Sequence, residues 1–163
     1  TLAPSAVTTG KIANGAVTNA KLDTTTGEIG AAWQSWTPTW TNVSGGTLNY
    51  AKYIQIGKTV HFRLKYTLAG AGVSGAGIFS LPTTLHADYT TISGSFNAGV
   101  FIYDTSPGNV YYGYLSIESS TTVRIFIINT ATTNAAAANI SATGPMTWAS
   151  GDIIQVAGTY EAA

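Results

Sequence analysis

The chain of 163 residues contains no cysteine. It therefore cannot form disulfides, thiolate zinc sites or cysteine nucleophiles. A domain of this size must then be stabilised by the packing of its own core or by association with other chains. No apolar run approaches the roughly 20 residues that a membrane-spanning helix needs, so we expect no membrane insertion.

Charge is also scarce. Seven basic and seven acidic residues make up 9% of the chain and leave a formal net charge of zero, whereas ordinary soluble domains contain about 25% charged residues. A nucleic-acid partner needs a basic surface, so this composition argues against one. The abundant Thr, Ser, Asn and Gly residues are compatible with uncharged, hydroxyl-bearing ligands such as glycans.

Acid–base groups are few as well. His61 and His86 are the only histidines, and they lack the spacing of metal ligands. A glycosidase needs two carboxylates, one of them with a raised pKa. After residue 32 the carboxylates lie at turns, at strand ends or near the terminus: Asp88, Asp104, Glu118, Asp152 and Glu161. We expect no catalytic residues, no metal, no cofactor and no enzymatic activity.

A ten-residue repeat occupies residues 6–25, where AVTTGKIANG is followed by AVTNAKLDTT. Each unit offers few large apolar side chains, and ordering each residue costs roughly 1–2 kcal/mol of backbone entropy. Two units are too few for a solenoid, so the repeat predicts lateral association of identical chains. A flexible linker rich in Ala, Thr and Gly is the alternative. Because Thr1 is not an initiator methionine, we also expect a longer parent polypeptide.

From residue 33 onward the sequence predicts β-strands. Apolar and polar residues alternate most clearly over residues 59–68, with the period of a half-buried strand. Residues 57 and 58 (GK) before it suit a type II′ hairpin turn. The apolar set should face the core and the polar set the solvent: Val60, Phe62, Leu64, Tyr66 and Leu68 inward, and His61, Arg63 and Lys65 outward.

Turn residues separate the remaining strands, and no helical pattern intervenes. This arrangement predicts an all-β, antiparallel β-sandwich of jelly-roll type, with two sheets of four strands. We expect a stem over residues 1–32 and this head over residues 33–163. The further strands are expected at residues 35–41, 50–56, 77–81, 91–96, 99–103, 110–117, 122–128 and 152–160. We expect a flexible loop over residues 69–77 and either a helical turn or an exposed loop over residues 130–143.

Aromatic residues give the positive functional signal. Trp36 and Trp40 have strand-like spacing and are expected in the core or a subunit interface. A turn over residues 104–109 precedes three tyrosines that alternate between two faces, so at least one should be exposed. Tyrosine rings stack on sugars, and Asp or Asn binds hydroxyls. The candidate ligand site is Asp104, Asn109, Tyr111, Tyr112 and Tyr114. The alternative is that these tyrosines pack between sheets or subunits.

The repeat and four later blocks resemble one family. Residues 7–22 (VTTGKIANGAVTNAKL) resemble the repeats of bacteriophage tail fibres and related tail-tip proteins. Blocks in the head domains that follow such repeats are similar to residues 36–40 (WTPTW), 53–60 (YIQIGKTV), 79–82 (FSLP) and 148–152 (WASGD). The resemblance covers most of the chain. It carries over no binding residues and identifies neither host nor ligand.

The resemblance implies a homotrimeric tail fibre or receptor-binding protein of the virion, at the tail fibre or tail tip. Its head would attach the virion to a host cell-surface polysaccharide or another cell-wall glycan, and its N-terminal side would contact other tail proteins. One alternative is a purely structural, trimerising tip without a receptor site. Another is a glycan-degrading tail enzyme, which the scarcity of carboxylates disfavours.

Overall fold

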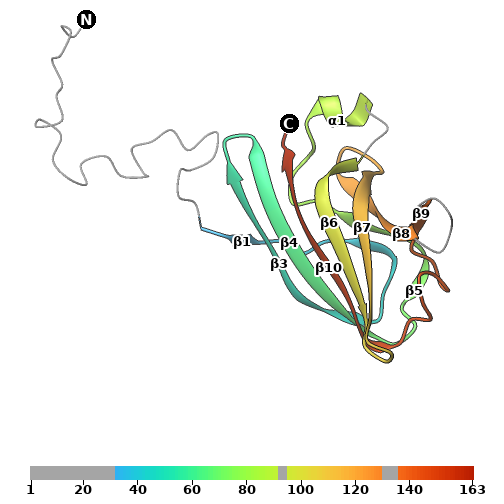
Figure 1. Ribbon diagram of the computed structural model, residues 1–163. Helices are drawn as coiled ribbons and strands as arrows, with labels where there is room; N and C mark the ends of the chain where they lie inside the picture. Colours follow the sequence, from blue (N-terminus) through green and yellow to red (C-terminus); the bar gives the residue numbers. More distant parts are fainter. Residues whose placement is uncertain (1–31, 92–94, 130–135) are drawn as a thin grey trace, which may run out of the picture.

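The computed structural model describes residues 32–91, 95–129 and 136–163 (Figure 1). Within them lie ten strands and one short helix. In chain order these are β1 (Gln34–Ser35), β2 (Trp40–Val43), β3 (Gly46–Ile56), β4 (Thr59–Ala69), β5 (Val73–Ser80), α1 (Ala87–Thr91), β6 (Ser95–Asp104), β7 (Asn109–Ile117), β8 (Thr122–Asn129), β9 (Ala136–Asn139) and β10 (Ser150–Glu161). The repeats of the expected stem lie outside the described residues, so the stem and its boundary with the head stay predictions.

All the strands belong to one antiparallel sheet in the order β1-β3-β4-β10-β6-β7-β8-β5-β2, with β9 paired to β8. The prediction of an all-β, antiparallel head is confirmed. The strands form one curled sheet in place of two separate sheets of four, because β10 pairs with both β4 and β6 and joins the two groups. The inner face of this curl encloses the core.

The two ends of the sheet meet at Trp36. β1 and β2 lie at opposite ends of the strand path, yet only residues 36–39 separate them in sequence. The backbone N–H of Trp36 donates to the Ala51 carbonyl of β3 at 3.2 Å. Its indole Nε1 donates to the Ser80 carbonyl of β5 at 3.3 Å. One tryptophan therefore links the strand beside β1 to the strand beside β2.

Strand β4 has the predicted register. The apolar residues from Val60 to Leu68 face the core and are buried, while Arg63 is exposed and both His61 and Lys65 are partly exposed on the other face. Burial of one face fixes the register, since a slip of one residue would expose the whole apolar set. The turn before β4 is also as predicted: Gly57 has a φ of 59°, and Ile56 pairs directly with Thr59.

The predicted packing of Trp36 and Trp40 against the core is confirmed. The Trp40 ring lies 5.0 Å from Tyr66 and 5.2 Å from Phe79, centroid to centroid. The Trp36 ring meets Phe62 edge-on at 6.2 Å. The Trp40–Tyr66 contact joins β2 to β4, which lie far apart in the sheet order, so it helps to hold the curl closed.

The prediction of a flexible loop over residues 69–77 is wrong in its second half. Strand β5 begins at Val73, inside the glycine-rich run. Gly77 is buried there, and a Cβ at this position would lie 2.5 Å from Cδ1 of Ile140. The glycine therefore permits close packing within a strand, which composition alone cannot distinguish from flexibility.

Three other strand predictions need correction. The single strand expected at residues 35–41 is replaced by the end of β1 and the start of β2, which are separated by residues 36–39. The strand expected at residues 91–96 is wrong at its described ends: Thr91 ends helix α1, and residues 95 and 96 belong to β6, which also contains the strand expected at 99–103. The described part of residues 130–143 contains β9, where a helical turn or loop was expected. Strand β5 pairs with β8 only through residues 122–124, so the far half of β8 is open for β9 to join.

Candidate functional site

The β6–β7 hairpin carries the five predicted site residues. Its turn returns the chain so that Asp104 pairs with Asn109, and Gly108 has a φ of 76°. Asn109 is exposed, but Asp104 is only 7% exposed, and its Oδ1 accepts a hydrogen bond from the Ser106 backbone N–H at 3.2 Å. This carboxylate has a partner within the turn, and its predicted contact with a sugar hydroxyl stays a prediction.

The three tyrosines alternate as predicted. Tyr111 faces inward and packs against the core. Tyr112 faces outward and is 65% exposed, and Tyr114 lies on the same face. The structure thus divides the predicted site: Asn109, Tyr112 and Tyr114 stay candidates for ligand contact, whereas Asp104 and Tyr111 belong to the interior.

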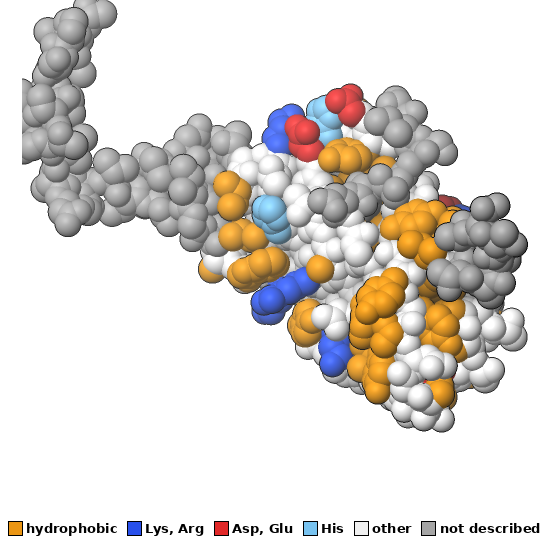
Figure 2. Space-filling view, in the orientation of Figure 1, with side chains coloured by type: hydrophobic (Ala, Val, Ile, Leu, Met, Phe, Trp, Pro, Cys, Tyr) orange, Lys and Arg blue, Asp and Glu red, His pale blue; other side chains and the backbone are white. Residues whose placement is uncertain are grey.

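Four aromatic side chains form an outer aromatic cluster, which we define as Phe101, Tyr112, Tyr114 and Phe126. Phe101 and Tyr112 meet edge to face, with centroids 5.9 Å apart. Tyr114 and Phe126 stack at 5.4 Å with an interplanar angle of 11°. Figure 2 shows hydrophobic side chains gathered over this part of the surface, with Lys and Arg side chains beside them. The cluster is held on three adjacent strands, so its rings have fixed positions.

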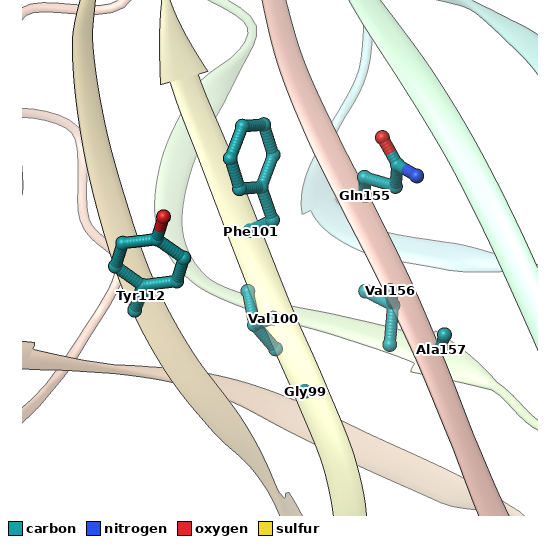
Figure 3. Close-up of a pocket in the computed structure, with 7 residues that line it drawn as sticks. All are labelled: Gly99, Val100, Phe101, Tyr112, Gln155, Val156 and Ala157. Carbon is teal, nitrogen blue, oxygen red and sulfur yellow. The ribbon is translucent and has the colours of Figure 1, made fainter.

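A hollow of about 500 Å³ lies beside the cluster, over β10, β6 and β7 (Figure 3). Phe101 and Tyr112 stand on one side of it and Gln155 on the other, while Gly99 and Ala157 leave its floor without large side chains. A Cβ added to Gly99 would meet no atom within 4 Å. The lining residues are Gly99, Val100, Phe101, Tyr112, Gln155, Val156 and Ala157.

Sequence reasoning missed Phe101, Gly99 and Gln155. Phe101 could have been found, since it alternates with Val100 and Ile102, whose side chains are buried. Gln155 could not, because the pairing of Gln155 with Phe101 joins strands more than fifty residues apart in sequence. The alternation of residues within one strand does not predict which strands pair over such a separation.

The neighbouring half of the outer face carries positive charge. Arg63, Lys52 and Lys65 project from β4 and β3, on the same face as Gln155 and Ala157. Arg63 lies over the Trp33 ring at 4.7 Å, and Lys52 Nζ donates to Ser35 Oγ at 2.7 Å. The ion pairs within the described ranges, His86 with Asp88 and Arg124 with Glu118, include none of these three cations.

The remaining titratable groups have structural partners. Asp152 is buried, and its two oxygens accept hydrogen bonds from Thr105 and from the Ala149 backbone N–H. His61 Nδ1 lies 2.9 Å from Thr159 Oγ1. Among the residues that the structure describes, no three His, Cys, Asp or Glu side chains gather where they could hold a metal ion. No helix in the described part of the chain has the length and apolar character needed to cross a membrane.

Comparison with known proteins gives two structural matches. No protein-family model matches the sequence, and no curated protein matches it. The two matching structures are crystal forms of the C-terminal receptor-binding domain of the avian reovirus fibre sigmaC. The first has a TM-score of 0.46 and 15% identity over 82% of this chain and 80% of that chain. The second has a TM-score of 0.45 and 15% identity over 82% and 77%.

Proposed function

We propose that this chain is the receptor-binding end of a homotrimeric bacteriophage tail fibre, and that its head attaches the virion to a glycan on the host cell surface. The observation that carries the proposal is the outer aromatic cluster beside an open hollow, with Tyr112 65% exposed. Contiguous apolar patches on a protein surface mark interaction sites. Binding groups held on rigid strands lose little entropy when a ligand binds.

The sequence supports the fibre context. Residues 7–22 resemble tail-fibre repeats, and the thin repeat needs neighbouring chains to complete a core. Three chains joined at a stem would display three equivalent heads to the cell. Weak single sites then suffice, because multivalency raises overall avidity by about 10²–10⁴. Other tail proteins would join from the N-terminal side, which places the chain at the tail fibre or tail tip of the virion.

Two other functions make different predictions. A purely structural tip would form the same trimer but would not adsorb to cells. A glycan-degrading enzyme needs two carboxylates beside the bound sugar, and no described carboxylate lines the hollow. Our proposal therefore contains no enzymatic role.

Adsorption of the purified protein to bacterial cells tests the proposal. Fluorescently labelled full-length chain is mixed with a panel of strains of differing surface polysaccharide, and bound protein is measured by flow cytometry. We expect saturable binding to a subset of strains, with competition by unlabelled chain. A trimer that adsorbs to no strain of the panel would favour the structural tip. Loss of polysaccharide viscosity on incubation would favour the enzyme.

A further inference from the structure

The outer face of the sheet is divided into two halves of different chemistry. Strands β6, β7 and β8 carry the outer aromatic cluster, and β3 and β4 carry Lys52, Arg63 and Lys65. Strand β10 runs between these halves, with Gln155 and Ala157 on the same face. The hollow therefore lies at the boundary between aromatic rings and cations.

The aromatic side of the hollow suits one face of a sugar ring. A pyranose has a flat apolar face of C–H groups, and aromatic rings bind such faces. Phe101 and Tyr112 present an edge-to-face pair beside the glycine floor, so a ring can approach them without meeting a side chain at Gly99. On the opposite side the Gln155 amide can both donate to and accept from ring hydroxyls.

The cationic side of the hollow suits a negatively charged substituent. Lys65 lies directly opposite Gln155 in the pairing of β4 with β10, and Arg63 lies opposite Ala157. Directly opposite residues on one face have Cβ atoms about 4.5–5.5 Å apart. Neither cation has a carboxylate partner within the described residues. The Arg63 guanidinium lies over the Trp33 ring, on the side of β4 away from β10, so Lys65 is the cation that an anion beside Gln155 would meet.

We propose that the hollow binds an acidic saccharide, a hexopyranose that bears a carboxylate. Its ring lies against Phe101 and Tyr112 over Gly99, and its carboxylate points toward Lys65. The inference rests on the proposed function and names the ligand class of that receptor site. The overall composition is compatible with an uncharged ligand, whereas the position of Lys65 beside Gln155 favours an acidic one.

The position of the hollow argues against its being covered by a second copy of the chain near the stem. The chain enters the head at β1, and β10, β6 and β7 lie three to five strands from β1 in the sheet order. With neighbouring strands about 4.7–4.9 Å apart, the hollow lies roughly 15–25 Å along the sheet from the entry strand. Subunits held together at that entry would leave the hollow open.

The experiment uses the full-length chain on an array of uronate- and sialate-containing oligosaccharides, each printed beside its carboxyl-reduced, neutral counterpart. We expect the acidic member of a bound pair to bind about tenfold more tightly, and Lys65→Gln to remove that preference. Lys58→Gln removes the same charge at the β3–β4 turn and should keep the preference. Sedimentation of every variant checks that assembly is unchanged.

A second pair of variants tests the hollow itself. Gly99→Val fills the floor in open space and should weaken binding of both members of a pair by about tenfold or more. Tyr112→Ala should do the same, while Val110→Ala, an exposed change at the neighbouring end of β7, should bind as the unmodified chain. Affinities are measured by biolayer interferometry with the best acidic oligosaccharide of the array.

The remaining outcomes overturn the inference in distinguishable ways. Equal binding of the acidic and the carboxyl-reduced oligosaccharide would show that the ligand need not be acidic. Normal binding by Gly99→Val would show that the ligand does not bind in the hollow. In both cases, adsorption to cells would still support the receptor-binding function. Adsorption without any array binding places recognition on another ligand or surface. Dissociation of the assembly by Gly99→Val or Tyr112→Ala makes this face a subunit interface. If the chain adsorbs to no strain of the panel, the proposed function itself is contradicted.

Discussion

Asp152 at the start of β10 is bonded twice to Thr105 in the β6–β7 turn. Its Oδ1 accepts from the Thr105 backbone N–H at 3.0 Å and from the Thr105 hydroxyl at 3.1 Å, across 47 positions of sequence. Its other oxygen accepts from the Ala149 backbone N–H at 2.7 Å. A buried carboxylate thus fixes the end of the hairpin whose strands carry Phe101 and Tyr112.

We predict that Asp152→Ala strongly destabilises the head. The substitution removes the acceptor of the Thr105 and Ala149 N–H groups, and each lost hydrogen bond to a charged group costs about 1.5–3 kcal/mol. Asp152→Asn keeps one carbonyl oxygen and should lose less. The free energy of unfolding is measured by urea denaturation with circular dichroism. An Asp152→Ala midpoint equal to that of the unmodified chain would show that this carboxylate does not fix the turn.

A second prediction concerns the two faces of β4. Phe62 is 2% exposed and contacts both Trp36 and Tyr160 ring to ring. Phe62→Ala should therefore lower the free energy of unfolding by about 3–5 kcal/mol. The neighbouring His61 faces outward, and its ring bonds the Thr159 hydroxyl, so His61→Ala should cost little. Thermal melts compare the two, and equal shifts in melting temperature would contradict the register.

The extent of sequence-based prediction is clear from β4 and from Asp104. Residues 59–68 were placed correctly because a strand with one buried face must alternate apolar and polar residues, and this alternation is visible in the sequence. Asp104 was placed in a turn correctly, and its Oδ1 accepts the Ser106 N–H there, while its assignment to ligand contact stays a prediction. A turn-forming Asp can bind a neighbouring N–H or a ligand, and composition cannot tell which of the two satisfies the carboxylate.

The hollow could not be predicted because it depends on which strands become neighbours. Gly99 and Ala157 are unremarkable in sequence, and only the pairing of β6 with β10 sets them side by side. The position of Trp36 between Ala51 and Ser80 has the same origin. Local patterns specify strands and faces, whereas sheet order follows from long-range pairing and packing.

A third prediction concerns assembly. The repeats over residues 6–25 are expected to join three chains, so sedimentation should give about three times the chain mass of 16.9 kDa. Removal of residues 1–31 should lower the mass toward that of one chain and leave the β-sheet signal of the head. A full-length chain that stays monomeric at micromolar concentration would contradict the trimeric stem.

The last prediction concerns alkaline pH. Tyr160 is buried, and its hydroxyl donates to the Thr83 carbonyl at 3.0 Å and accepts from the Thr83 N–H at 3.1 Å. Burial raises the pKa of Tyr160 above its ordinary value of 10.0. The folded chain therefore retains a proton that the unfolded chain releases. The contribution of the Tyr160 hydroxyl to the free energy of unfolding is thus complete below about pH 10 and is lost as the pH rises toward the folded-state pKa.

Tyr160→Phe loses the Thr83 bonds at every pH but has no proton to release. The difference in unfolding free energy between the unmodified chain and Tyr160→Phe, followed by urea denaturation from pH 8 to 11, should shrink above pH 10; a constant difference would contradict the buried, protonated hydroxyl.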